Sequence, residues 1–410
     1  MMPIELLAPA GNIEKLRTAF NFGADAAYMG LTSFSLRKNA GNFTAGDLEQ
    51  AAELKRKTGK KLYCTMNILF SEEQIRQAEE LIPTLKDSPF DAFIITDLGL
   101  VGLFQKYLPD RELHLSTQAS CLNSSAARLY RDLGFSRVIL GREASLDDIR
   151  RIKDAVPELE LEAFVHGAMC MSYSGRCMLS SFLTGRSANQ GDCSHTCRWN
   201  YKLHYALEEE ERKGTYYPVE EQDGYTTILS SKDLCMIDHL DDLIASGLSS
   251  LKIEGRMKSV YYIALVTRAY RKALDRDTDW MKYRDDLFNV SHREYSTGFF
   301  YGHDAVDVND IDRPTSYGYQ REYLYLGAVK EEVQSGIWSL DIRNQIRVSK
   351  PVEYIGYDVY RIEDDTFQLL DEDLNPVEKL DHGKTGYLKT DKALKPGYII
   401  RSEAEIKTIN

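Results

Sequence analysis

One pattern of hydrophobic and polar positions repeats along the first two thirds of the chain. A short run of β-branched or aromatic residues is followed by a turn and then by an amphipathic stretch with apolar residues at i, i+3 and i+4, which is typical of strands alternating with helices. The predicted strands are Ile4–Ala8, Ala26–Leu31, Lys61–Asn67, Ala92–Asp97, Glu112–Thr117, Arg137–Gly141, Leu159–His166 and Ser250–Glu254. Eight such units predict an α/β fold, a (β/α)8 TIM-like barrel.

Capping residues set the ends of the predicted helices. Short polar side chains satisfy the first free N–H groups of a helix, and glycine adopts the left-handed conformation that ends one. The predicted N-caps are Asn12, Ser71, Asn123 and Ser145, and the predicted C-terminal glycines are Gly23, Gly59 and Gly134.

Two departures from this pattern define the domain organisation. A long insertion, residues 168–249, follows the seventh predicted strand, and its acidic run Glu208 to Glu211 is expected to be solvated. Beyond about Tyr323 the pattern changes to short alternating strands broken by turns, which is typical of a small β-barrel. We predict a barrel over 1–280 with the insertion at 168–249, a linker over 281–322 and a C-terminal β-barrel domain over 323–410.

Composition narrows the class of protein. The 410 residues have an ordinary hydrophobic content of 43% and a formal net charge of −12, which argues against a general nucleic-acid coat protein. The first residues, MMPIELLAPAGN, have neither the basic nor the apolar region of a secretory signal, and no apolar run reaches the length of a membrane span. We therefore expect a cytoplasmic protein without membrane contact, in which thiols stay reduced.

Four of the seven cysteines fall close together, at Cys170, Cys177, Cys193 and Cys197. Thiolates bind soft metals, and four of them complete a zinc site or hold an iron–sulfur cluster. The spacing C-x6-C, C-x15-C, C-x3-C has no C-x2-C pair, which favours an iron–sulfur cluster over zinc, and we expect a [4Fe-4S] cluster. Buried structural thiols or disulfides are the alternatives, and the Ser-, Gly- and Asn-rich flanks argue against burial.

Polar residues gather where the barrel strands are predicted to end. Active sites of such barrels form at the C-terminal ends of the strands. The residues placed there are Asn67, Asp97, Ser116, Gln118, Arg142, Glu143, His166, Glu254 and Arg256, with Lys258 close behind. Taken singly they have structural explanations: Asp97 and Asn67 as helix caps, Gln118 as a loop contact, His166 as a core histidine, and Arg256 as a partner of Glu254.

Three separate motifs resemble a known family. ELLAPAGN, the segment HGAMCMSYSGRCMLSSFLTGRSANQGDCSHTCRWNY and SLKIEGRMKS look like the signatures of the collagenase-like peptidase family, in the right order and over roughly residues 4–400. The length most resembles the branch that forms 5-hydroxyuridine at the tRNA wobble position. The resemblance implies oxygen-independent hydroxylation of RNA that depends on prephenate and uses an iron–sulfur cluster held by the four cysteines.

The resemblance also assigns roles to residues. Arg256, with Arg142, is expected to hold a prephenate carboxylate, and Asn67, Gln118 and Lys258 to contribute to binding. Proton transfer is expected from His166, Tyr173 or Glu254. Cys235 stays open as a replacement for Cys197 among the cluster ligands. An iron–sulfur assembly or electron-transfer protein is a further expected partner.

The residues alone leave two questions open: where the protein would contact RNA, and whether it has a different function. A single-stranded anticodon loop can offer its base to a pocket, and two groups of basic residues are candidates for the tRNA contact: the LKRKTGKK segment at 54–61 and Lys384, Lys389, Lys392 and Lys395. The rivals are a peptidase, for which the chain has neither an H-E-x-x-H nor a G-x-S-x-G motif, an enzyme acting on rRNA, and a non-enzymatic cluster scaffold.

Overall fold

The computed structural model describes residues 4–31, 34, 43–170, 172–198, 232–302 and 322–404, together with four two-residue strands between 207 and 226. The insertion's acidic residues 209–211 and the linker residues 303–321 lie outside this description. The chain divides into two compact units. The first contains residues 1–16, 25–257 and 293–318, and the second contains residues 17–24, 258–292 and 319–410.

Eight parallel strands close into a barrel in the first unit, which confirms the predicted fold. They are β1 (Glu5–Pro9), β2 (Ala26–Gly30), β3 (Lys61–Met66), β4 (Ala92–Ile95), β5 (Glu112–Leu115), β6 (Phe135–Ile139), β7 (Glu160–Ala168) and β13 (Ser250–Ile253). Each strand pairs with its neighbour, and β13 closes the ring by pairing with both β1 and β7. The strands are buried on both faces, as parallel barrel strands must be.

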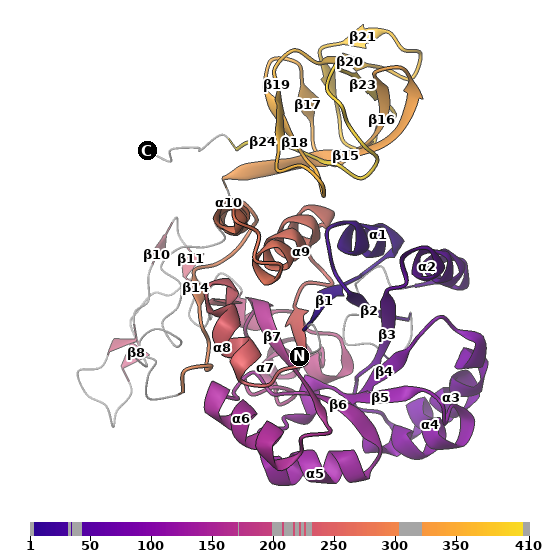
Figure 1. Ribbon diagram of the computed structural model, residues 1–410, viewed down its shortest axis with the longest axis vertical. Helices are drawn as coiled ribbons and strands as arrows, with labels where there is room; N and C mark the ends of the chain where they lie inside the picture. Colours follow the sequence, from indigo (N-terminus) through magenta and orange to yellow (C-terminus); the bar gives the residue numbers. More distant parts are fainter. Residues whose placement is uncertain are drawn as a thin grey trace. The chain divides into compact units, whose positions relative to one another are not determined.

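The helices follow the strands in chain order, and four of them begin directly after the predicted N-caps Asn12, Ser71, Asn123 and Ser145. They are α1 (Ile13–Asn21), α2 (Ala45–Thr58), α3 (Glu72–Leu81), α4 (Val101–Tyr107), α5 (Ser124–Asp132), α6 (Leu146–Ala155), α8 (Leu240–Ala245) and α9 (Val260–Leu274). Figure 1 shows α2 to α6 as an outer layer around β2 to β6. Ser71 and Ser145 each form a capping box. Asn12 and Asn123 accept a backbone N–H with their side chains.

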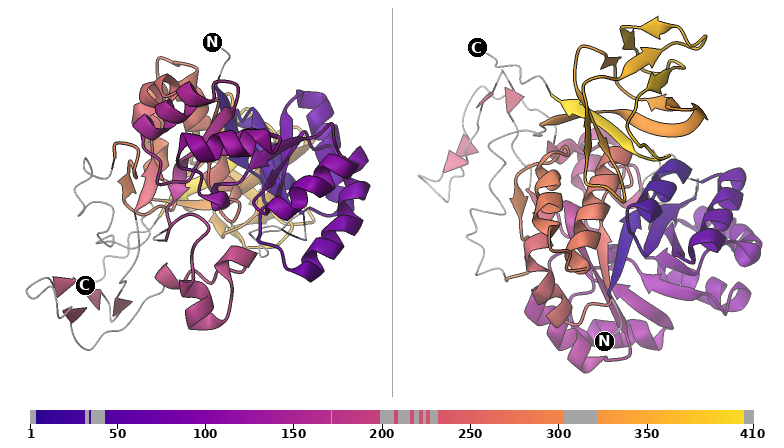
Figure 2. Two further views of the ribbon diagram at one scale, coloured as in Figure 1. Left: turned by 90° about the horizontal axis from the view of Figure 1, so that it is seen from below. Right: turned by 45° about the horizontal axis from the view of Figure 1, so that its top comes forward.

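Strand β7 is longer than the other barrel strands, and its last residues pair with a strand that the sequence pattern did not reveal. This strand, β12 (Asp233–Cys235), runs antiparallel to β7 with Asp233 opposite Ala168 and Cys235 opposite His166. It pairs in turn with β14 (Tyr295–Ser296). The insertion therefore leaves the barrel and returns to it beside the same strand. Within it, α7 (Leu179–Thr184) projects from the end of the barrel opposite the start of β1 (Figure 2, left).

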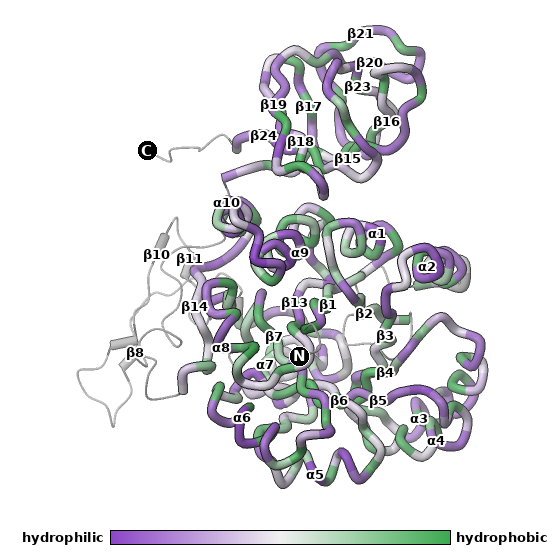
Figure 3. Tube along the Cα trace, viewed as in Figure 1, coloured by the Kyte–Doolittle hydropathy of each residue, from purple (hydrophilic) through white to green (hydrophobic). Residues whose placement is uncertain are grey.

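The C-terminal domain is an antiparallel sheet in the order β19-β18-β24-β15-β16-β23-β20-β21. These strands are β15 (Tyr323–Gln334), β16 (Ile337–Ile342), β18 (Val352–Ile355), β19 (Ile362–Asp364), β20 (Gln368–Leu370), β21 (Pro376–Val377), β23 (Tyr387–Lys389) and β24 (Ile399–Glu403), beside the pair β17 (Ile346–Arg347) and β22 (Lys379–Leu380). Green and purple alternate along the chain of this domain (Figure 3), and its buried core includes Leu326, Trp338 and Tyr354. Register shifts bend β15 so that it pairs with both β16 and β24.

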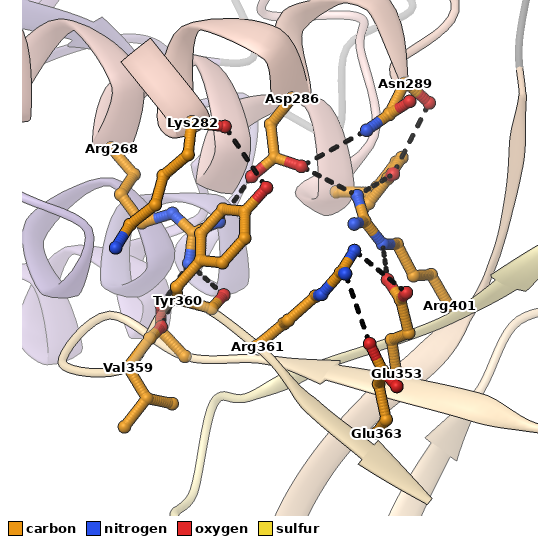
Figure 4. Close-up of polar contacts among 12 residues, drawn as sticks. Arg268, Lys282, Asp286, Asn289, Glu353, Val359, Tyr360, Arg361, Glu363 and Arg401 are labelled. Carbon is orange, nitrogen blue, oxygen red and sulfur yellow. Dashed lines mark hydrogen bonds and ion pairs between the residues drawn. The ribbon is translucent and has the colours of Figure 1, made fainter. Parts of the chain in front are cut away.

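A buried charge network joins α9 and its neighbours to this sheet within the second unit. The expected linker, 281–322, begins inside helix α10 (Trp280–Asp285) and continues with the 3-10 helix η7 (Asp286–Phe288). Asp286 accepts hydrogen bonds from Arg268 of α9 at 2.7 Å and from Arg401 of β24 at 3.1 Å (Figure 4). Arg401 also donates to Glu353 at 2.7 Å. Since all of these contacts fall inside one compact unit, α9 packs as part of the C-terminal unit.

Candidate active site at the barrel mouth

Arg256 follows β13 and points into the barrel, where it is almost completely buried. Its Nη1 donates to Thr65 Oγ1 at 3.0 Å, and Thr65 in turn donates to the carbonyl of Met29. Lys15 holds the Arg256 backbone by donating to its carbonyl oxygen at 3.0 Å. Arg256 is therefore held at its backbone by Lys15 and at its guanidinium by Thr65, and a fixed fork of donors suits a carboxylate or phosphate ligand.

Arg142, which follows β6, provides a second cation. Its guanidinium lies 4.1 Å from the centre of the Phe164 ring, a cation–π contact that orients it without neutralising it. Its Nη2 is 3.9 Å from Glu254 Oε2, too long for a hydrogen bond. The Arg142 side chain is 10% exposed and that of Glu254 is 17% exposed, so both reach solvent at the mouth. This loose pair leaves Arg142 available to an anionic ligand.

A buried ion network fills the barrel below this pair. Lys252 donates to Glu162 Oε1 at 2.6 Å, and Arg137 donates to Glu162 at 3.0 Å and to Glu5 at 2.6 Å. Lys252 also lies 5.4 Å from the Phe164 ring. Burial lowers the pKa of Lys252, and Glu162 opposes that effect. Burial alone would raise the pKa of Glu162, but Lys252 and Arg137 outweigh it and the pKa is lowered, so the carboxylate stays charged.

Three of the polar residues expected at the strand ends have structural contacts. Asp97 accepts N–H bonds from Phe70 and Gly99 at 2.8 and 2.9 Å, and so serves as a cap. Ser116 caps the next short helix by accepting from Gln118 N–H. Asn67 is half-buried, and its carbonyl accepts from Thr96 at 3.1 Å.

The remaining predicted residues are spread over different surroundings. His166 is buried in β7, with its ring 5.4 Å from that of Tyr295. Tyr173 is 61% exposed on the cysteine-bearing segment. Gln118 is half-buried after β5. Lys258 belongs to the second compact unit, where it donates to the carbonyl of Ser291. The structure thus gathers Arg142, Glu254, Phe164 and Lys252 into one group.

The four cysteines lie on the segment that follows β7. Cys170 is exposed, and Cys177, Cys193 and Cys197 are partly exposed; none of the four forms a disulfide among the described residues. Helix α7 packs against the 3-10 helix η5 (Thr196–Arg198), and Ser180 accepts the N–H of Ser194 at 3.0 Å. These contacts bring the chain around Cys177 beside the chain that carries Cys193 and Cys197.

The donor chemistry of this segment fits a thiolate-bound metal group. The N–H of His195 donates to Cys193 Sγ at 3.4 Å, a contact that stabilises a thiolate. In the part of the chain that the structure describes, no three His, Cys, Asp or Glu side chains form a metal-ion ligand set. The cysteine thiols are nevertheless suitable donors, because they are at least partly exposed and lie on stretches of chain that contact one another.

Sequence reasoning missed the residues that support the site from below. Phe164 and Glu162 lie inside β7, and the pattern showed only that β7 is buried. Charged residues in a buried parallel strand were the available signal, because they are rare there unless paired. Tyr295 had no signal, since β14 is only two residues long.

The fold and the polar group at the strand ends together define a (β/α)8-barrel protein that has two largely buried arginines, Arg142 and Arg256, after its barrel strands and a cysteine-rich segment after β7. The chain belongs to peptidase family U32. The family profile matches residues 11–310, and the profile of the peptidase family U32 C-terminal domain matches residues 321–401. This confirms the resemblance found in the sequence motifs.

Curated relatives align with most of the chain. It is 34% identical to the tRNA hydroxylation protein P1 of Bacillus subtilis (strain 168), over 97% of this chain and 94% of the relative. It is 43% identical to the tRNA hydroxylation protein P of Helicobacter pylori (strain ATCC 700392 / 26695), over 73% of this chain and 72% of the relative. A protein named collagenase from Porphyromonas gingivalis (strain ATCC BAA-308 / W83) is 28% identical over 96% of both chains.

Proposed function

We propose that this protein is a tRNA-modifying enzyme that hydroxylates the wobble uridine to 5-hydroxyuridine in an oxygen-independent reaction that uses prephenate. Two relatives named for tRNA hydroxylation align with most of the chain. The structural observation that supports the proposal most directly is the loose Arg142–Glu254 pair, at 3.9 Å, held against Phe164 at the barrel mouth. It offers an oriented cation to the carboxylate of a small acid.

The overall chemistry sets what the site must do. The uridine C5–H bond breaks and a C5–O bond forms, which is a two-electron oxidation of the base. If the acid donates the hydroxyl group, its own C–O bond breaks and a C–H bond forms, so that it accepts the two electrons. An iron–sulfur cluster held by Cys170, Cys177, Cys193 and Cys197 supplies one-electron transfer when bound.

The chain's own residues bind the acid and move the proton. Arg256, fixed by Thr65, and Arg142, fixed by Phe164, hold the two carboxylates of prephenate. As the acid enters, its carboxylate takes the place of Glu254 beside Arg142, and Glu254 or the buried His166 accepts the proton from the base. Tyr173, exposed on the cysteine segment, is available to stack on the base.

The contacts of the basic residues narrow the candidate tRNA surface. In the 54–61 segment, Lys55 pairs with Asp91 and Lys57 with Glu53. In the C-terminal domain Lys395 pairs with Asp358, whereas Lys384 and Lys389 are exposed. We therefore place the tRNA contact at Lys384 and Lys389. Charge reversal of both should weaken tRNA binding and flatten its salt dependence, with Lys57→Glu as the matched control.

A reconstituted reaction tests the function. Protein purified without oxygen is incubated with tRNA from a strain that lacks the gene, with and without prephenate, and the nucleosides are analysed by mass spectrometry. We expect 5-hydroxyuridine only when prephenate is present, and little of it with Arg142→Met. Unchanged tRNA together with cleavage of collagen peptides would favour the peptidase alternative, and modified rRNA would redirect the substrate assignment.

A further inference from the structure

A tight turn separates Cys170 from Cys177. The N–H of Arg176 donates to the carbonyl of Tyr173 at 3.0 Å, which closes the turn over Ser174 and Gly175. Tyr173 and Arg176 are exposed, whereas Ser174 is only 4% exposed. The tip of the turn is therefore inserted into the protein, although the segment on either side of it faces solvent.

Loops from two neighbouring strands hold this tip. Glu143, after β6, accepts the N–H of Ser174 at 2.8 Å. The N–H of Arg142 donates to Ser174 Oγ at 3.3 Å. Ser120, after β5, donates to the carbonyl oxygen of Ser174. The backbone N–H, the carbonyl and the side chain of one serine are thus all bonded to the barrel.

Gly175 makes an equally close contact on the other side of the turn. Its φ of +73° is in the left-handed region, and a Cβ atom at this position would lie 2.1 Å from the carbonyl oxygen of Gln118. Any side chain would therefore push the turn away from the loop that follows β5.

Glu143 holds the turn at an energetic cost. Its Oε1 bonds to Ser174, but its Oε2 is buried and has no hydrogen-bond partner among the residues that the structure describes. An incompletely satisfied buried carboxylate is unfavourable on its own. The position of this carboxylate next to Arg142 indicates a task beyond the stability of the loop.

We propose that Glu143 is a positioning residue that fixes the Ser174–Gly175 turn, and through it holds Cys170 and Cys177 beside Arg142 before any metal binds. The inference rests on the proposed function only for the identity of the metal group, because every contact of the turn is made between residues of this chain. Since Ser174 is bonded to the Arg142 backbone, loosening the turn also loosens the anion-binding arginine.

Hydrogen exchange on the metal-free protein tests the positioning directly. In Glu143→Ala, the amides of residues 174–176 should exchange about tenfold faster, because a bond to a charged acceptor is lost. Glu143→Gln keeps an acceptor for Ser174 and should stay near the native rate. The matched control is Asp148→Ala, which removes the neighbouring carboxylate that accepts the N–H of Ser145 without touching the turn.

A second measurement follows the metal group. After anaerobic reconstitution, Glu143→Ala should hold less iron and sulfide and lose its visible absorption several-fold faster in air, whereas Glu143→Gln should resemble the native protein. Gly175→Ala disturbs the same turn from the Gln118 side and should behave like Glu143→Ala, which keeps the test decisive if that variant folds poorly.

The two measurements separate the inference from the proposed function. Native exchange and native cluster retention in both Glu143→Ala and Gly175→Ala would overturn the positioning role. If the native protein binds no iron but the exchange pattern changes as expected, the turn is a positioning element and the assigned cofactor is wrong.

Discussion

Arg268 and Asp286 form a buried ion pair, with 2.7 Å between Nη2 and Oδ2 and side chains only 2% and 1% exposed. The other end of the guanidinium donates to three backbone carbonyls of the β18–β19 connection, as Figure 4 shows. One side chain of α9 therefore organises a loop of the C-terminal sheet. The pair makes this connection sensitive to a single substitution.

Arg268→Met should strongly destabilise the C-terminal unit. It leaves the buried carbonyls without a donor and removes one of the two cations at Asp286, which costs about 3–5 kcal/mol of unfolding free energy. Urea unfolding followed by tryptophan fluorescence measures the loss. Lys282→Met, which removes the surface pair with Asp279, is the control and should leave the midpoint nearly unchanged. Equal midpoints for the two variants would refute the role of Arg268.

Acid should destabilise the C-terminal sheet through Asp364. Burial would raise the pKa of Asp364, but hydrogen bonds from Thr390, Thr366 and Tyr354 outweigh it and lower the pKa. Because the folded pKa is below the unfolded value of about 3.9, the stabilisation is complete above that pH and is lost as the pH falls through the folded pKa. Thermal unfolding at a series of pH values measures this loss.

Asp364→Asn should unfold at a lower temperature at neutral pH and lose less stability in acid. The exposed carboxylate of Asp373 is the control, and Asp373→Asn should keep the native pH profile. An unaltered acid response in Asp364→Asn would show that other groups control it.

The barrel's internal pair should show strong coupling. Lys252→Met leaves Glu162 with Arg137 alone and should cost about 3–5 kcal/mol in denaturant unfolding. The double variant Lys252→Met/Glu162→Leu removes the buried charge imbalance and should recover part of this loss, because Arg137 keeps Glu5 and Glu160. Additive losses in the double variant would contradict the pairing.

Glu254→Gln should separate binding from catalysis. Removing the carboxylate beside Arg142 should tighten the binding of a dicarboxylic acid roughly tenfold, since the ligand no longer competes with Glu254. Calorimetry with prephenate measures the affinity, and turnover should fall if Glu254 takes the proton. Weaker binding in this variant would show that Glu254 orients Arg142 for the ligand.

Serine variants should identify the ligand set of the metal group. Replacing Cys170, Cys177, Cys193 or Cys197 singly should lower the iron and sulfide content of the reconstituted protein sharply. Cys235 lies on β12, opposite His166 of β7, and Cys235→Ser should keep the native iron and sulfide content. Loss of iron in Cys235→Ser together with its retention in Cys197→Ser would exchange the two cysteines in the ligand set.

Local signals predicted the architecture well, and long-range pairing explains what they left out. Ser71 and Ser145 begin helices where the pattern places them, and Lys55, near the end of α2, donates to Asp91. The pair of Glu5 and Arg137, by contrast, joins residues 132 positions apart, and no periodicity records such a contact. Strand β12 was missed because three residues are too few for a recognisable alternation.

The return of β12 to β7 also bears on how this family can vary. Ala168 and Asp233 are direct partners in the sheet, so the two ends of the intervening chain are already joined by the barrel itself. Closing a loop between fixed neighbours becomes only slightly more costly as the loop grows, by about 0.6 kcal/mol for each doubling of its length. Residues can therefore be added to or removed from the middle of this segment with little effect on the pairing that closes the barrel.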